Sequence, residues 1–309
     1  MTVVSAPGKI ILMGEHAVVF GKPAIALAIG MRLRCAAAPS AHSTVNGEIL
    51  TERNSSYIMA AMRGHWSGGP LSFEISSDVP SGSGLGSSAA VTVASLGAMA
   101  SMNGRLVEED VARKAFDVES IVQGRASPID TSVSTHGQGI FIDSQKGPDL
   151  LWEISRDTRR WFVHHCDVPE MTMVIGFTGI RKPTGPLVAK VKRYADHSSF
   201  AREIVDDIGA LTLEGAERLR NKDLEALGRL MTKDHNLLAI LGVSSPDLQK
   251  LVDASLPHSY GAKLTGAGGG GSMIALTDKP DKVAAAIASR GGIPYVVRTG
   301  VDGVRVDGE

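Results

Sequence analysis

Residues 79–94, VPSGSGLGSSAAVTVA, place a glycine-rich loop directly before a run of small apolar residues. The run contains no proline and predicts a helix over residues 86–102. Backbone N–H groups of the loop Gly82–Ser88 can converge on an anion, and the helix dipole favours negative charge at this end. The stretch therefore predicts a phosphate site, with a plain turn and a serine N-cap as the alternative.

The surrounding sequence excludes two common kinds of phosphate-binding site. No lysine ends the loop, as a Walker A motif requires, and no acidic residue ends a second strand about 20 residues further on, as a dinucleotide-binding fold requires. The 32 Lys and Arg residues balance 33 Asp and Glu residues, and no basic block stands out. We therefore expect a small ligand, and neither a nucleic-acid nor a membrane partner.

Length and apolar patterning predict an α+β fold in two domains, over residues 1–165 and 166–309. The chain has 309 residues and is 43% hydrophobic, enough for a large core. The first half predicts mostly strands up to residue 75, helices over 86–102 and 108–122, a strand at 139–142 and an irregular polar stretch over 143–160. The second half predicts a strand at 172–177, helices over 185–194, 200–221, 224–241, 246–255 and 280–289, and a strand at 294–298.

Cysteine and histidine usage predicts a cytoplasmic protein without structural zinc. Cys35 and Cys166 are the only cysteines and fit a reducing compartment better than a disulfide framework. The N-terminal region lacks a basic segment followed by an apolar one, so we expect no secretory leader. The nine histidines show no metal-ligand spacing.

The segment APGKIILMGEH, residues 6–16, carries three candidate functional side chains. Lys9 precedes an apolar strand, and Glu15 and His16 follow that strand, where active-site loops often lie. A surface lysine and a solvated Glu–His pair are the alternatives. Their occurrence together in one short segment favours a functional role.

The segment DVESIVQGRASPIDTSVSTHG, residues 117–137, carries two acidic candidates. Glu119 lies on a predicted helix, and we expect Asp130 in the loop after it. A magnesium-bound phosphoryl donor needs one carboxylate for the metal and another near the attacking hydroxyl. A role for Asp130 as a helix N-cap alone is the alternative.

A second glycine cluster lies in KLTGAGGGGSMIAL, residues 263–276. Four consecutive glycines, Gly268–Gly271, lower the stability of any helix or strand, because glycine loses much backbone entropy on folding. The cluster predicts a close approach of the backbone to a ligand or to another loop. A tight turn is the alternative.

Taken in this order, the motifs PGKIILMGEH, PSGSGLGSSAA and KLTGAGGGG resemble those of the GHMP kinases, and the resemblance spans nearly the whole chain. The segment GEHAVVFGKPAIA is similar to the mevalonate kinases within that superfamily, in particular the archaeal type. The resemblance implies an N-terminal domain like domain 2 of ribosomal protein S5 and a ferredoxin-like α+β C-terminal domain. It also implies a homodimer.

The resemblance assigns a role to each candidate residue. It implies that the ATP phosphates are bound by Pro80, Ser81, Gly82, Ser83, Gly84, Leu85, Gly86, Ser87 and Ser88. It implies Mg²⁺ coordination by Ser88 and Glu119, and catalysis by Asp130 and Lys9 at the acceptor hydroxyl. Glu15 and His16 would contact the substrate, Arg181 would bind its carboxylate, and Lys182 and Thr184 are further candidates.

The implied reaction is transfer of the γ-phosphoryl group of ATP to the 5-hydroxyl of (R)-mevalonate. Another GHMP kinase, acting on phosphomevalonate or homoserine, and a non-catalytic regulator that binds ATP or a metabolite are the alternatives. The chain departs from the family pattern at Pro128, where glycine is usual, and we expect a stiffer loop there.

Overall fold

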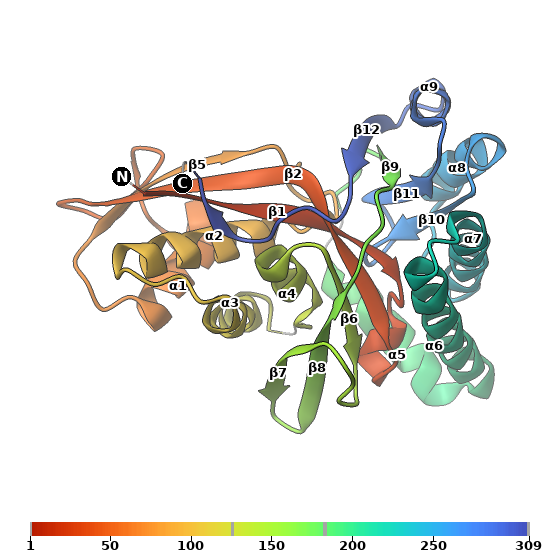
Figure 1. Cartoon of the computed structure of the whole chain (residues 1–309), viewed down its shortest axis with the longest axis horizontal. Helices are drawn as coiled ribbons and strands as arrows, with labels where there is room; N and C mark the ends of the chain where they lie inside the picture. The colour runs from red at the N-terminus through yellow and green to blue at the C-terminus, as the bar shows by residue number, and fades with distance from the viewer. Residues whose placement is uncertain (1, 125–126, 182–183, 308–309) are drawn as a thin grey trace.

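The computed structural model describes residues 2–124, 127–181 and 184–307, and it contains two β-sheets with helices packed on them (Figure 1). The first sheet has strand order β4-β3-β5-β2-β6-β8-β7, and β1 pairs with both β2 and β13. Its strands are β1 (Thr2–Met13), β2 (Ala24–Pro39), β3 (Thr44–Val45), β4 (Glu48–Ile49), β5 (Leu71–Ser77), β6 (Gly139–Asp143), β7 (Leu150–Arg156), β8 (Arg159–Cys166) and β13 (Arg305–Val306).

The second sheet has strand order β10-β11-β9-β12, and all three of its pairings are antiparallel. Its strands are β9 (Thr172–Phe177), β10 (Gly261–Thr265), β11 (Ser272–Leu276) and β12 (Ile293–Arg298). The division of the chain into domains after residue 165 stays a prediction, because β13 returns from the second half to pair with β1 in the first sheet.

The helices fall into two groups, one with each sheet (Figure 1). The first group comprises α1 (Glu52–His65), α2 (Ser87–Met102), α3 (Glu108–Gln123) and α4 (Ile129–His136). The second comprises α5 (Thr184–His197), α6 (Ser199–Arg220), α7 (Leu224–Ile240), α8 (Pro246–Ser255) and α9 (Pro280–Ser289), with short 3₁₀ segments η1 (Ala17–Phe20) and η2 (Leu256–His258) elsewhere. The predicted α+β class is confirmed.

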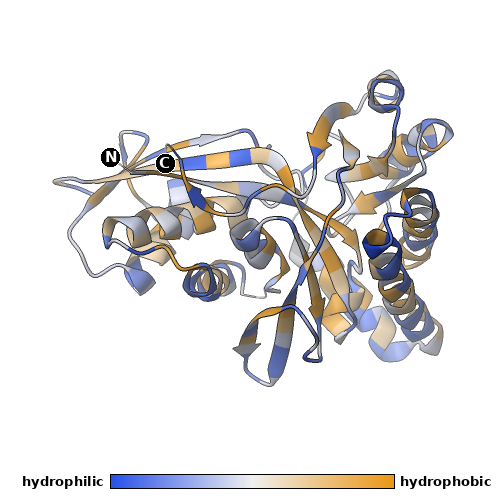
Figure 2. Cartoon of the chain, in the orientation of Figure 1, coloured by the Kyte–Doolittle hydropathy of each residue, from blue (hydrophilic) through white to orange (hydrophobic). Residues whose placement is uncertain are grey.

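Small residues set the distance between α2 and the first sheet. Ala90, Val93 and Ala94 are fully buried against it. A Cβ atom added at Gly97 would lie 2.9 Å from Cγ1 of Val4 and 3.0 Å from Cγ2 of Val304. The small apolar run therefore lets α2 pack closely on β1, which fixes the start of the helix relative to Lys9. Apolar residues lie mainly on the inward faces of sheets and helices, and polar residues lie on the outer side of α6 (Figure 2).

Helix α1 and the hairpin β7–β8 differ from the sequence prediction, and so does α4, which is described with the site below. Helix α1 interrupts the segment expected to be mostly β, and Thr51 caps it by accepting a hydrogen bond from the backbone N–H of Asn54. The stretch expected to be irregular forms the hairpin β7–β8, in which Trp152, Ile154 and Trp161 are buried. These strands escaped prediction because the turn and the strand ends beside it, residues 155–160 (SRDTRR), are polar and charged.

In the described part of the chain, no helix combines the length and the apolar character that crossing a bilayer demands.

Candidate active site

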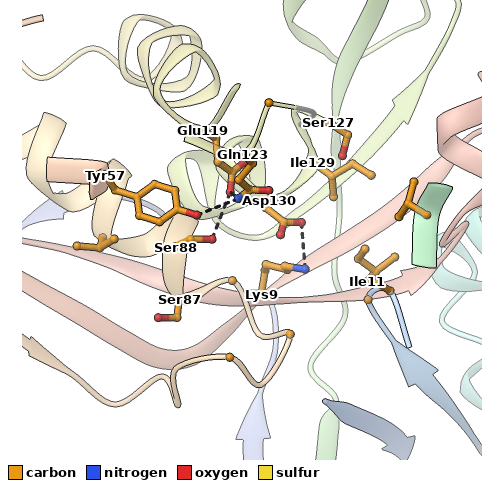
Figure 3. A pocket seen from close by; sticks show the side chains of 18 of the residues that line it. Lys9, Ile11, Tyr57, Ser87, Ser88, Glu119, Gln123, Ser127, Ile129 and Asp130 are labelled. Atoms are coloured by element: carbon orange, nitrogen blue, oxygen red, sulfur yellow. Dashed lines mark hydrogen bonds and ion pairs between the residues drawn. The ribbon is translucent and has the colours of Figure 1, made fainter. Parts of the chain in front are cut away.

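A cavity of about 1090 Å³ is lined by segments from both halves of the chain. Its walls come from β1, the start of α2, the helices α1, α3, α4 and α5, the β7–β8 hairpin and the loop 266–271. Figure 3 shows side chains from β1, α1, α2, α3 and α4 converging on one part of it. The predicted functional segments therefore meet in one place.

The glycine loop is built as the sequence predicts. Gly82, Gly84 and Gly86 have φ angles of 71°, 82° and 78°, in the left-handed region that favours glycine. Gly86 is the N-cap of α2, so the loop ends at a helix N-terminus. Ser81, Gly82, Gly84, Gly86, Ser87 and Ser88 line the cavity. The loop thus presents backbone N–H groups at the positive end of the helix dipole, which is suited to phosphate.

The other three loop residues hold the loop in place. The Ser83 hydroxyl donates to the carbonyl of Pro80 at 2.7 Å. Leu85 is fully buried, and its carbonyl accepts a 2.9 Å hydrogen bond from the backbone N–H of Lys9. A register shift in β1 between Pro7 and Gly8 permits this approach of the loop to a strand. Their part is to position the loop.

Lys9 and Asp130 form the central ion pair of the site. Lys9 Nζ lies 3.0 Å from Asp130 Oδ1, and the Lys9 side chain is only 4% exposed, against 30% for Asp130. The pair is labelled in Figure 3. Asp130 lies in the first turn of α4 and not in a loop, and Pro128 occupies the N-cap position, so the capping alternative is wrong.

Helix α4 is tied to the strand that carries Lys9. The Ser134 hydroxyl donates a 2.7 Å hydrogen bond to the carbonyl of Pro7. Both groups are buried, so this contact fixes the spacing of helix and strand. The geometry of the Lys9–Asp130 pair is therefore set by rigid elements.

Glu119 and Ser88 lie together beside this pair. The Ser88 hydroxyl donates to Glu119 Oε1 at 3.3 Å, and Gln123 Nε2 donates to the same oxygen at 3.1 Å. Gln123 Nε2 also lies 3.2 Å from the hydroxyl of Tyr57. Burial and the nearby charge of Asp130 raise the pKa of Glu119 to about 8. A cation bound here would reverse that effect.

The donors at this point fit a small hard cation. A hydroxyl and a carboxylate are oxygen ligands, and Glu119 has no ion pair with any lysine or arginine that the structure describes. Within the described residues, no group of three or more histidine, cysteine or acidic side chains forms a complete metal site. Mg²⁺ binding of this type leaves room for water and phosphate oxygens.

Glu15 lies in a buried charge cluster that the sequence did not predict. Its carboxylate pairs with Lys263 Nζ, which also lies 3.3 Å from Asp234 Oδ2. Glu15 is 1% exposed, and Lys263 and Asp234 are fully buried. Burial and the neighbouring Asp234 raise the pKa of Glu15 to about 7, against the opposing influence of Lys263. Glu15 is therefore not a solvated surface residue.

His16 lies at the edge of this cluster and lines the cavity. Its φ angle is 62°, and its Nε2 atom lies 2.9 Å from the carbonyl oxygen of Ala267. Burial lowers the pKa of His16 below its usual value. A neutral imidazole that donates from Nε2 to this carbonyl leaves Nδ1, a buried atom with no partner among the described residues, as an acceptor.

The second glycine cluster makes the close approaches that the sequence predicts. A Cβ atom at Gly268 would lie 2.2 Å from the carbonyl oxygen of Val243. One at Gly270 would lie 3.0 Å from the carbonyl oxygen of Ile180, and one at Gly271 would lie 3.1 Å from that of Ser83. The Ser272 hydroxyl donates to the same Ser83 carbonyl at 2.8 Å. The second glycine cluster therefore packs directly against the glycine-rich loop 80–88.

The segment that carries Arg181, Lys182 and Thr184, TGIRKPT (residues 178–184), is only partly described by the structure. Arg181 is exposed and is not among the residues lining the cavity; its aliphatic carbons lie over Gly82, where an added Cβ would come within 2.9 Å of Arg181 Cδ. Thr184 begins α5, and Lys182 lies outside the described residues. The roles predicted for these three residues stay predictions.

Comparisons with known proteins identify the family of this chain. A model described as the GHMP kinases N terminal domain matches residues 54–138, and one described as GHMP kinases C terminal matches residues 216–292. The mevalonate kinase of Thermococcus sibiricus is 36% identical, over 98% of this chain and 97% of that protein. The chain belongs to the GHMP kinase family.

Further relatives place this GHMP kinase among the mevalonate kinases. The mevalonate kinase of Pyrococcus furiosus is 34% identical, over 99% of this chain and 98% of that protein. The crystal structure of L. major mevalonate kinase in complex with R-mevalonate superposes with a TM-score of 0.82 at 25% identity, covering 97% of this chain and 96% of that one. The predicted GHMP kinase fold and the predicted class of ATP-dependent phosphotransferase are confirmed.

Proposed function

We propose that the protein transfers the γ-phosphoryl group of ATP to the 5-hydroxyl of (R)-mevalonate, giving 5-phosphomevalonate and ADP. The observation that carries the proposal is the position of the Lys9–Asp130 pair in the same cavity as the N-terminus of α2. A phosphate site and a polarised carboxylate in one cavity are the minimum that phosphoryl transfer to an alcohol requires. The named relatives supply the acceptor, mevalonate.

Asp130 is the proposed acceptor of the hydroxyl proton. Its carboxylate is 30% exposed and paired with Lys9, so it is reachable from the cavity and held in position by the adjacent ammonium. Lys9 is almost completely buried and stabilises negative charge that develops on the attacking oxygen. Together the two residues orient the hydroxyl, accept its proton and stabilise the negative charge that develops on its oxygen.

The loop 80–88 binds the phosphates of ATP through its backbone N–H groups in this proposal. Ser88 and Glu119 hold Mg²⁺, which, when bound, neutralises the charge of the phosphate oxygens. Gln123 and the Ser88 hydroxyl keep Glu119 in place through hydrogen bonds of 3.1 and 3.3 Å. Glu15 and His16 form the part of the wall next to the loop 266–268 and fix its shape.

One coupled assay of ADP release tests the proposal. The purified protein is assayed with ATP and Mg²⁺ against mevalonate, phosphomevalonate, homoserine and galactose in turn. We expect turnover with mevalonate, and turnover with a different acceptor alone would overturn the substrate assignment. ATP binding without turnover on any acceptor would favour a regulator. A homodimer in the cytoplasm remains part of the proposal, and sedimentation velocity tests the oligomeric state.

A further inference from the structure

The β7–β8 hairpin places two arginines directly opposite each other at its turn. The strand register pairs Arg156 with Arg159, and it pairs Ile154 with Trp161. Side chains alternate along a strand, so the two arginines lie on the same face of the hairpin as Ile154 and Trp161, which are both buried. Arg156 and Arg159 line the active-site cavity together with Trp161.

No ion pair engages either arginine within the described part of the chain, although Asp157 lies between them in the turn and lines the same cavity. Neither side chain has an acidic group within ion-pair distance there, and the buried Nη1 atom of Arg156 has no hydrogen-bond partner. Like charges directly opposite in a sheet are destabilising, and a buried, unpaired donor of a charged group adds a further cost. The neighbouring Arg160 pairs with Glu153 at 3.1 Å. A contact within the fold therefore accounts for the charge of Arg160, whereas no such contact accounts for the charges of Arg156 and Arg159.

An anion in the cavity would explain the pair. Lys9, another cation on the wall, is already engaged by Asp130, whereas Arg53 of α1 and Lys192 of α5 line the cavity without an ion pair to a described residue. The glycine loop supplies a separate, uncharged site for phosphate at the start of α2. The hairpin cations are therefore available to a second anionic group.

Apolar side chains also line the cavity. Ile11, Val18, Val19, Ile129 and Val188 come from β1, η1, α4 and α5. A ligand suited to this wall is a short branched aliphatic molecule with a hydroxyl group at one end and an anionic group at the other. A carboxylate matches the paired N–H donors of a guanidinium.

We propose that Arg156 and Arg159 bind the carboxylate of the acceptor and thereby select it. This inference rests on the proposed function, and it names the residues that recognise the end of mevalonate remote from the reacting hydroxyl. It assigns that recognition to a hairpin absent from the sequence prediction, in place of Arg181, which is not among the residues that line the cavity. Arg156 and Arg159 are specificity-determining residues and take no part in proton transfer.

The test compares Arg156→Gln and Arg159→Gln with the matched control Arg160→Gln. Each protein is assayed with mevalonate and with its uncharged methyl ester, and mevalonate binding is measured separately by calorimetry. We expect each of the first two substitutions to raise the KM for mevalonate about 10- to 100-fold, the worth of a charge-assisted hydrogen bond. The KM for ATP stays unchanged, the variants show no further loss with the ester, and Arg160→Gln behaves as the wild type.

Four results overturn the inference. An unchanged mevalonate KM in Arg159→Gln, whose exposed side chain makes misfolding an inadequate explanation, excludes recognition by the pair. A raised KM for ATP instead assigns the pair to the nucleotide. An equal loss with the methyl ester shows a structural role, and a raised mevalonate KM in Arg181→Gln alone returns the role to that residue. Wild-type inactivity on mevalonate with retained, Arg156-dependent binding refutes the proposed reaction but not the carboxylate site.

Discussion

Lys9 and Asp130 are separated by 121 positions in the sequence, yet their charged atoms lie 3.0 Å apart on the wall of the cavity. The contact depends on a bulged strand, a helix tied to that strand by Ser134, and a glycine at position 86. Each of these supports provides a separate way to test the site.

Replacement of Asp130 tests the proton acceptor directly. We expect Asp130→Asn to lower kcat by on the order of 10² or more, because the amide neither accepts the proton nor pairs with the Lys9 ammonium. The KM for mevalonate should change little. Steady-state kinetics measures both, and turnover close to that of the wild type would remove Asp130 from the mechanism.

Replacement of Gly86 tests the close approach of the glycine loop to Lys9. A Cβ atom at this position would lie 2.7 Å from Lys9 Cγ, and φ is 78°. Gly104 is the matched control, because its φ is 81° but nothing lies within 4 Å of an added Cβ. We expect Gly86→Ala and Gly104→Ala each to lose about 1–2 kcal/mol of stability from the left-handed backbone, as measured by urea denaturation. Only Gly86→Ala should also lose kcat, and equal activity of the two variants would contradict the proposed contact.

Replacement of Glu119 tests the metal site. The Gln side chain keeps its size and its hydrogen-bonding capacity but removes the charge that a divalent cation needs. We expect Glu119→Gln to require at least tenfold more Mg²⁺ for half-maximal activity, about 1.4 kcal/mol of lost binding. Gln123→Leu, which removes the supporting hydrogen bond to Glu119 together with the one to the Tyr57 hydroxyl, should show a smaller shift in the same direction. An unchanged Mg²⁺ requirement in Glu119→Gln would exclude this carboxylate as a ligand.

The buried Glu15 cluster predicts a pH dependence of stability. The pKa of Glu15 is raised from 4.5 to about 7 in the folded protein, so between these values the folded state holds a proton that the unfolded state has released. Stability attributable to this group is therefore present in full below pH 4.5, and it is lost as pH rises to about 7, by on the order of 1 kcal/mol per pH unit.

Urea denaturation at several pH values checks this expectation. Glu15→Gln carries no titrating proton at this position, so the difference in unfolding free energy between wild type and variant should change across pH 4.5–7 and level off above it. A difference that is constant with pH would show that Glu15 titrates normally. Lys263→Met offers a companion measurement, since an unpaired buried carboxylate should cost about 3–5 kcal/mol.

Local sequence signals predicted most of the regular structure. The helices α2, α3, α6, α7, α8 and α9 begin and end within a few residues of their predicted bounds. Helix α2 was predicted from its proline-free run of small apolar residues, and the others were predicted from apolar stripes. Helix α1 was missed, since its mean hydropathy is low and only Ile58 and Ala61 are buried in it. Asp130 was expected in a loop because a proline such as Pro128 normally ends a helix. In the structure Pro128 is instead the N-cap residue at the start of α4, and Asp130 lies in the first turn of that helix.

Site residues that lie within short motifs could be predicted from the sequence. Contacts between residues far apart in the sequence could not. Lys9, Ser88, Glu119 and Asp130 stand in recognisable segments, and the structure brings them together. The pairing of Lys263 with Asp234 gave no such signal, because a lysine and an aspartate in separate elements usually face solvent. The register that opposes Arg156 and Arg159 depends on a turn whose strands were themselves not predicted.

The pairing of β13 with β1 has a consequence for the order in which the protein forms during synthesis. Arg32, on β2, donates hydrogen bonds to the carbonyls of Asp302 and Gly303, and Val304 donates to the carbonyl of Thr135 at the end of the helix that carries Asp130. Asp302, Gly303 and Val304 leave the ribosome after the strands of the second sheet. The phosphate-binding half therefore cannot complete its own sheet first, and the catalytic helix gains its last anchor only after the second sheet has been translated.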